Sequence, residues 1–182
     1  MKIKTIFADR LYVFHYDGMT NNELQRLFLD WTDVEFLFNF FEENNNDLQS
    51  GFYGNISVED AVISTLQEAQ LLEEFIYDNR ENKKFRFHEL FDKNLNKRKS
   101  PLIELIPKKA YGPFTHSWLR LYAIEASKEC YIVTGGAIKL TRKMLDRKHT
   151  STEIDKMNMC LNYLKDNGIF DIKGINETIE FD

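Results

Sequence analysis

The sequence predicts an α+β fold: a small, twisted, mainly antiparallel sheet with helices packed on one face, preceded by an N-terminal extension of strand and helices. Three observations lead to this class. Short runs rich in β-branched and aromatic residues follow one another at turn-length separations in the second half of the chain. Helix-capping motifs precede amphipathic stretches in both halves. The 182 residues, 43% hydrophobic and 14% aromatic, are enough for one core at about 150 residues per domain.

The first half is expected to open with β-structure and continue with helices. Residues 3–16 are rich in β-branched and aromatic side chains, which is typical of one strand or a hairpin. Capping boxes at Thr20–Glu23 and Thr32–Glu35 predict two helices, and a third box at Ser57–Asp60 predicts a long one. The second helix is rich in phenylalanine and apolar over most of its circumference, so we expect it to be buried or held against a partner.

The second half is expected to hold the sheet. Residues 102–106 are predicted to form one strand. Three further β-rich runs are separated by segments of turn length, which predicts an antiparallel meander. These runs are residues 118–125, 130–134 and 137–141. Gly135 and Gly136, between the last two runs, are expected to form a hairpin turn or a bulge.

The chain is expected to end with a long helix and a short tail. A capping box at Thr150–Glu153 predicts the helix, and Asn167-Gly168 is a plausible left-handed cap at its end. The tail from residue 169 is predicted to add one strand. Because no repeat or linker interrupts the sequence, we expect one compact unit, with an acidic region at 1–92 and a basic region at 93–182.

Charge distinguishes these two regions. The net charge of −5 is the sum of 24 Lys and Arg and 29 Asp and Glu. Residues 1–92 hold 8 basic and 18 acidic side chains, a net of −10, whereas residues 93–182 hold 16 and 11, a net of +5. Residues 93–148 hold 13 basic and four acidic side chains. The acidic total therefore does not exclude nucleic acid as a ligand, although charge runs are also common on ordinary solvated surfaces.

Composition also predicts the compartment. The mean hydropathy is −0.45, and no apolar run approaches the roughly 20 residues that cross a bilayer. The N-terminus lacks the apolar core of a signal peptide. Cys130 and Cys160 have neither metal nor redox spacing, which fits a reducing interior. We therefore expect a cytoplasmic protein that does not bind a membrane or a cofactor. We also expect no metal site, since His88-Glu89 lacks a second set of ligands.

One face of the predicted meander is expected to be open and basic. Side chains alternate across a strand, so Arg120, Tyr122 and Lys139 fall opposite the apolar side chains that pack on the helices. Cations neutralise phosphate and an aromatic ring stacks on a base, which together suit single-stranded RNA. The same cations would stabilise the pentavalent phosphate formed when a ribose 2′-hydroxyl attacks its own backbone. An exposed face that carries such residues for solubility is the alternative.

Four segments of the second half carry a family resemblance. They are Leu-Ile-Glu-Leu (102–105), Leu-Arg-Leu-Tyr (119–122), Ile-Val-Thr-Gly-Gly-Ala-Ile-Lys-Leu-Thr-Arg-Lys-Met (132–144) and Thr-Ser-Thr-Glu (150–153). In this order they resemble the RelE/HigB-type toxins of bacterial toxin–antitoxin modules. The resemblance implies ribosome-dependent cleavage of messenger RNA, with RNA or the ribosome and an antitoxin protein as partners. It places Arg120 at the family's strand arginine and Lys139 in its basic turn, where the usual Lys-Lys pair is here Lys139-Leu140.

The predicted function is therefore that of a metal-independent, RelE/HigB-like endoribonuclease. Arg120 and Lys139 would stabilise the phosphate, and Tyr122 would orient or stack a base. His116 is the candidate general acid or base, and His149, at a helix N-terminus, is the weaker one. The residues expected to bind the RNA backbone are Arg142, Lys143, Lys108, Lys109, Lys97 and Arg98.

Two other hypotheses remain at this stage. The same fold can serve as a non-catalytic interaction module, with the acidic N-terminal region as the surface that contacts a protein partner. Alternatively, this acidic region covers the basic face of the same chain and partly neutralises it.

Overall fold

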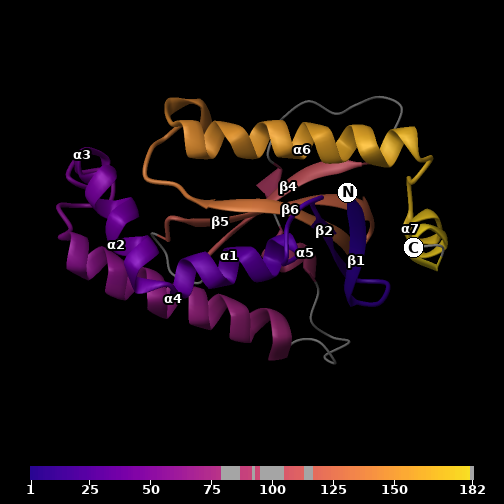
Figure 1. The fold of residues 1–182 in the computed structure, drawn as a ribbon, viewed down its shortest axis with the longest axis horizontal. Coiled ribbons are helices and arrows are strands. Elements are labelled where there is room, and N and C mark those ends of the chain that lie inside the picture. Colours follow the sequence, from indigo (N-terminus) through magenta and orange to yellow (C-terminus); the bar gives the residue numbers. More distant parts are fainter. Residues whose placement is uncertain (79–86, 92, 95–104, 113–116, 181–182) are drawn as a thin grey trace.

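The computed structural model describes residues 1–78, 87–91, 93–94, 105–112 and 117–180, and it confirms the α+β class with a mainly antiparallel sheet. The strands are β1 (Lys2–Phe7), β2 (Leu11–His15), β3 (Lys93–Asn94), β4 (Ile106–Tyr111), β5 (Leu119–Ser127) and β6 (Cys130–Ile138). They form one sheet in the order β1-β2-β6-β5-β4-β3 (Figure 1). All neighbours are antiparallel except β2 and β6, which run parallel.

Helices make up the rest of the regular structure. They are α1 (Glu23–Thr32), α2 (Val34–Glu43), α3 (Asn45–Leu48), α4 (Val58–Asp78), α5 (Phe87–Leu90), α6 (Lys148–Asp166) and α7 (Ile172–Glu180), with a 3-10 turn η1 at Met144–Asp146. Among the described helices, none is both long enough and apolar enough to cross a membrane.

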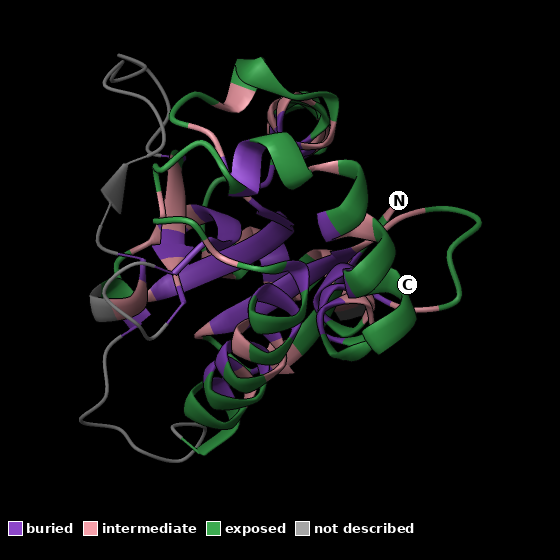
Figure 2. Ribbon diagram, turned by 90° about the vertical axis from the view of Figure 1, so that its left-hand side faces the viewer, coloured by how far each residue is buried: buried purple, intermediate pink, exposed green. Residues whose placement is uncertain are grey.

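The helices cover both faces of the sheet, whereas the sequence predicted one covered face. In Figure 1, α6 lies on one side of the strands and α1 and α4 lie on the other. Along β5, Leu119 and Leu121 pack with α1, α2 and α4, while Tyr122 and Ile124 pack with α6. The strands are accordingly buried between exposed helix surfaces (Figure 2). Helix α6 buries its apolar stripe against the sheet face that we expected to be open, because such a stripe is stable only when it is packed against another element.

The two charge regions share one sheet and both of the buried clusters that lie on its two faces. Strand β2 of the acidic region pairs with β6 of the basic region, with Val13 opposite Val133. The cluster of buried residues on the α1 side draws from both regions. The boundary near residue 92 therefore marks a change of charge and not a division of the fold.

The predicted N-terminal elements are present, with small shifts at the helix caps. Residues 3–16 form the β1-β2 hairpin. Helix α1 is capped by Asn22, whose side chain accepts a hydrogen bond from the Gln25 N–H at 3.0 Å, two residues beyond the expected Thr20. Helix α4 is capped by Ser57 as predicted, because the Ser57 hydroxyl accepts from the Asp60 N–H at 3.1 Å.

Gly135 and Gly136 do not turn the chain. They lie inside β6, which is continuous, and its register with β5 shifts just after Tyr122. A bulge in one strand is therefore correct and a hairpin turn is wrong. A Cβ on Gly136 would lie 2.6 Å from the Arg120 carbonyl oxygen and 2.9 Å from Leu27 of α1. Glycine is needed here because the helix packs directly on the strand.

Two later elements also differ from the prediction. The tail forms helix α7 instead of a strand, and its Ile175 is fully buried in the core beside α6. Of the strand expected at 102–106, residues 102–104 lie outside the described residues. The observed strand β4 continues through Pro107, which disfavours a strand in sequence-based reasoning. Gly168 has a φ of 68°, the left-handed cap that was predicted.

Candidate functional site

Four cationic side chains gather where β5 begins and β6 ends. We call Lys109, Arg120, Lys139 and Arg142 the basic cluster. The Arg120 guanidinium carbon lies 3.8 Å from the centroid of the Tyr111 ring, and the Lys109 ammonium lies 5.7 Å from the same ring. Burial lowers the pKa of Lys139, and the charges of Arg120 and Lys109 lower that pKa further. The Tyr53 hydroxyl lies 3.4 Å from Arg120 Nη2 and 2.9 Å from the Lys139 carbonyl oxygen, and the Lys139 ammonium lies 2.7 Å from the Arg142 carbonyl oxygen, so these residues are neighbours.

Arg120 is the fixed centre of the basic cluster. Its Nη1 donates hydrogen bonds to the carbonyl oxygens of Ser117 at 2.7 Å and Leu119 at 2.6 Å, and Nη2 approaches the Tyr53 hydroxyl at 3.4 Å. Arg120 is only 8% exposed, in contrast to the open position that we expected. Burial lowers the pKa of the guanidinium, although an arginine remains charged at neutral pH.

Lys139 organises the loop that follows β6. Its ammonium donates to the carbonyl oxygen of Thr141 and, at 2.7 Å, to that of Arg142. The Tyr53 hydroxyl donates to the Lys139 carbonyl oxygen at 2.9 Å. The exposed Arg142 guanidinium lies 5.8 Å from the centroid of the Phe52 ring. The loop therefore holds a second arginine and an aromatic ring beside the buried guanidinium.

Within the described ranges, no carboxylate is in an ion pair with a member of the basic cluster. Lys108, the neighbour of Lys109, does have such a partner, because its ammonium lies 2.9 Å from Glu125. The buried Glu68 lies in the surroundings of Arg120 but accepts its hydrogen bond from the Ser117 hydroxyl. Burial raises the pKa of Glu68, and the charge of Arg120 lowers it only in part. Asp146 raises the pKa of Lys139 and Arg120 lowers that of Glu68, but neither carboxylate is in direct ion-pair contact, so within the described part of the chain the positive charge of the basic cluster is only partly compensated.

Tyr122 shares the sheet face of Arg120, as strand alternation predicted, but it cannot stack on a base. The side chain is 1% exposed beneath α6. Its hydroxyl has no hydrogen-bond partner in the part of the chain that the structure describes, and burial raises its pKa. The predicted stacking role is wrong because α6 covers this face.

The remaining predicted residues are scattered. Lys143 is exposed beside Arg142, while Lys97, Arg98 and His116 lie outside the described residues. The His149 Nε2 lies 3.0 Å from the Ile138 carbonyl oxygen, and burial lowers the pKa of this imidazole. A lowered pKa leaves the ring neutral at pH 7, which agrees with its expected weakness as a general acid.

Burial excludes the two cysteines as nucleophiles, because the thiolate is the reactive form. Cys130 and Cys160 are both buried, and burial raises the pKa of each thiol to about 12. No group of three or more His, Cys, Asp or Glu side chains among the described residues is arranged to hold a metal ion.

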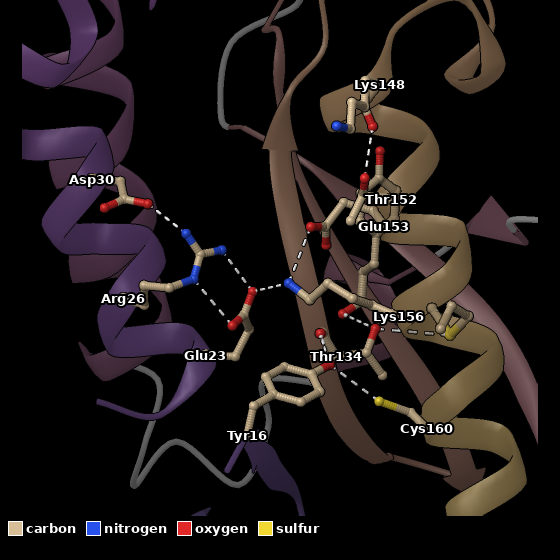
Figure 3. Close-up of polar contacts among 12 residues, drawn as sticks. Tyr16, Glu23, Arg26, Asp30, Thr134, Lys148, Thr152, Glu153, Lys156 and Cys160 are labelled. Carbon is tan, nitrogen blue, oxygen red and sulfur yellow. Dashed lines mark hydrogen bonds and ion pairs between the residues drawn. The ribbon is translucent and has the colours of Figure 1, made fainter. Parts of the chain in front are cut away.

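A second polar centre joins the two helical layers, and sequence reasoning missed it. We call Glu23, Arg26, Glu153 and Lys156 the buried ion network (Figure 3). The Lys156 ammonium contacts Glu23 of α1 and lies 3.0 Å from Glu153 of its own helix. Arg26 donates to both oxygens of Glu23, at 2.7 and 3.1 Å. Arg26 is also in an ion pair with Asp30, so each of the two cations contacts two carboxylates.

The buried ion network lies beside the part of β6 that β2 does not pair with. The Tyr16 hydroxyl donates to the Thr134 carbonyl oxygen at 2.5 Å, which caps this edge of the strand. A Cβ on Gly135 would overlap Oε2 of Glu153, so glycine is what admits the carboxylate. Glu153 is 6% exposed, its Oε2 has no partner among the described residues, and burial raises its pKa to about 7.

Glu153 was mistaken for a capping residue. Helix α6 begins at Lys148, before the predicted box, so Glu153 lies one turn inside the helix. A signal was present in the sequence: Glu153 continues, four residues earlier, the buried stripe of Met157, Cys160 and Leu164. A carboxylate on such a stripe is buried and needs a partner. Comparisons with protein-family models, with curated proteins and with solved structures give no match for this chain, so the resemblance to RelE/HigB-type toxins stays a prediction.

Proposed function

We propose that this protein acts on RNA and that the basic cluster receives a phosphate of the RNA backbone. The observation that carries the proposal is the buried guanidinium of Arg120 beside two lysines and an arginine, none of which forms an ion pair with a carboxylate of the described residues. A buried, unpaired cation costs several kcal/mol of stability, and an anionic ligand offsets that cost. Charge-assisted hydrogen bonds to phosphate are among the strongest that proteins make.

The surroundings of the basic cluster favour a polymer over a small anion. Arg142 and Lys143 extend the positive charge along the exposed loop. Phe52, 45% exposed and beside Arg142, supplies the aromatic surface that the buried Tyr122 cannot. An aromatic ring next to cations is the usual arrangement for single-stranded nucleic acid.

Cleavage of the RNA is the second part of the proposal, and it needs no metal. The 2′-hydroxyl of a ribose gives its proton to solvent and attacks the adjacent phosphorus, the bond to the 5′ oxygen breaks, and that oxygen takes a proton from Lys139, which leaves a 2′,3′-cyclic phosphate and a 5′-hydroxyl. Arg120 and Lys139 would stabilise the charge that builds on the phosphoryl oxygens. The lowered pKa of Lys139 makes its ammonium a better proton donor to the leaving oxygen than an ordinary lysine.

Binding is tested with a fluorescent single-stranded RNA of about 12 nucleotides. Replacing Lys109, Lys139 or Arg142 by alanine should each weaken binding about three- to tenfold and reduce the salt slope by about 0.7. Lys173→Ala is the matched control, since Lys173 is 83% exposed on α7 and carries the same charge. Equal binding by all four variants would refute the proposed site.

Cleavage is tested on the same RNA, with and without ribosomes, by gel electrophoresis. Arg120→Lys keeps the positive charge and is preferred over Arg120→Ala, which removes hydrogen bonds to two carbonyl oxygens. We expect Arg120→Lys to bind RNA but to cleave it at least about tenfold more slowly, because lysine lacks the bidentate geometry of arginine. Unchanged cleavage by Arg120→Lys and Lys139→Ala would contradict the catalytic part.

A further inference from the structure

Helices α1, α2 and α4 form an acidic layer on the sheet face opposite α6 (Figure 1). Residues 17–78, which contain these helices, hold 14 Asp and Glu against one Lys or Arg, Arg26, a net charge of −13. Arg26 is already bound to Glu23 and Asp30. The layer therefore exposes carboxylates such as Glu35 and Glu59, and its one cation, Arg26, is already in ion pairs.

The acidic layer also exposes large apolar side chains. Eight residues of its three helices are between 39% and 59% exposed. They are Leu29, Val34, Phe36, Phe38, Ile63, Leu71, Phe75 and Tyr77. Helix α6, of similar length to α4, has one such residue within the described part of the chain, Met159. Apolar side chains that gather on one layer, unlike scattered ones, mark an interaction surface.

A groove between α1 and α4 gives this surface a shape. Phe28 and Leu29 from α1 and Tyr77 from α4 supply its apolar part, and Gln25 and Glu73 supply polar groups. Its volume is about 290 Å³, at the lower end of the range for small-molecule sites. A space of this size between two helices suits the inserted side chains of another segment.

We propose that the acidic layer binds a basic amphipathic helix of a protein partner, with its apolar side chains in the groove between α1 and α4. Charge complementarity selects this occupant, because nucleic acid, an anionic membrane or an acidic helix would be repelled. Insertion of an amphipathic helix into an apolar groove is a common mode of recognition. The groove shares no residue with the basic cluster, so the proposal does not depend on RNA binding.

The probe is a fluorescein-labelled peptide of about 18 residues, long enough for five helical turns, made of leucine on one helical face and lysine on the other. A scrambled peptide of the same composition and a leucine–glutamate counterpart are the controls. We expect the full chain to bind the amphipathic lysine peptide at least about tenfold more tightly than the scrambled one. The glutamate peptide should not bind.

Two substitutions locate the binding surface. Leu29→Ser and Glu73→Gln should each weaken binding of the amphipathic lysine peptide about three- to tenfold. Leu29→Ser removes an apolar contact at the groove, and Glu73→Gln removes a negative charge. Leu145→Ser is the matched control, since Leu145 is 76% exposed on η1, outside the acidic layer. This variant should bind the amphipathic lysine peptide as tightly as the unchanged chain does. Circular dichroism verifies that each variant is folded.

Three results would overturn the proposal. Equal affinity for the scrambled peptide would mean that charge alone attracts the peptide and that the groove does not contribute to binding. Full affinity in both groove variants would place the site elsewhere. A dimer in sedimentation that Leu29→Ser dissociates would mean that a second copy of this chain covers the layer.

Discussion

The two polar centres beside β6 bury charge in opposite ways. In the buried ion network, Lys156 lies between Glu23 and Glu153, and every cation has a carboxylate partner. In the basic cluster, Arg120 is buried too, but its hydrogen bonds go to backbone carbonyl oxygens and a tyrosine hydroxyl. Among the described residues, the cations of the first centre are in ion pairs with carboxylates and those of the second are not.

This difference in pairing predicts a structural role for the buried ion network and a ligand-binding role for the basic cluster. A balanced set of buried charges links the helical layers on the two faces of the sheet, and removing one member leaves its partner unpaired in a low dielectric. In the basic cluster, losing a member leaves backbone carbonyl oxygens without a donor, but it leaves no carboxylate of the described residues without an ion-pair partner. We therefore expect substitutions in the buried ion network to change stability, and those in the basic cluster to change binding.

The largest effect is expected from Lys156→Met. This substitution leaves the carboxylates of Glu23 and Glu153 buried and facing each other, which should lower the free energy of unfolding by about 3–5 kcal/mol. Urea denaturation at pH 8 measures it. Lys173→Met is the control, because its ion pair with Glu177 at 3.6 Å is exposed and should contribute less than about 1 kcal/mol. A loss below about 1 kcal/mol in Lys156→Met would mean that the network is not structural.

A smaller effect should follow the titration of Glu153. Its folded-state pKa of about 7 lies above the ordinary value of 4.5, so the stabilisation is complete below the ordinary value and is lost as the pH rises through 7. Between about pH 6 and about pH 8.5 the loss should be about 1.4 kcal/mol. Urea denaturation at both pH values, in the unchanged chain and in Glu153→Gln, measures the difference.

The comparison of the two chains isolates Glu153 from the other titrating groups. The lowered pKa of His149 acts with the opposite sign: its contribution is present at high pH and is lost as the pH falls. That contribution is common to both chains and cancels in the difference. A pH dependence that persists unchanged in Glu153→Gln would assign the titration to another residue.

Local patterns predicted the elements of the fold better than their arrangement. The Ser57 cap and the left-handed Gly168 depend on neighbours within a few residues, and both are correct. Strand alternation correctly put Arg120 and Tyr122 on one face. An apolar stripe reveals that a helix must be buried but not which face of the sheet it will cover. The exposure expected of Tyr122 failed for this reason, whereas Arg120 is buried against Tyr111, Tyr53 and two backbone carbonyl oxygens.

The sites show the same limit. Glu23 and Lys156 are 133 residues apart in the sequence, so no local residue spacing predicts their contact. The cationic composition around Lys109, Lys139 and Arg142 is visible in the sequence, but whether a carboxylate of the described residues pairs with them is a property of the folded chain. Lys108 illustrates this point, because its pairing with Glu125 requires the register of β4 and β5.

The smallest change in stability is expected from Lys139→Met, the counterpart of Lys156→Met in the basic cluster. No carboxylate of the described residues loses an ion-pair partner, repulsion from Arg120 and Lys109 is relieved, and two hydrogen bonds to loop carbonyl oxygens are lost. These opposing terms should leave the free energy of unfolding within about 1 kcal/mol of the unchanged chain. Lys108→Met, which removes the ion-pair partner of the half-buried Glu125, should cost more than Lys139→Met under the same urea titration. If Lys139→Met instead costs as much as Lys156→Met, the ammonium is a structural element of the loop, and the positive charge of the basic cluster no longer supports a phosphate ligand.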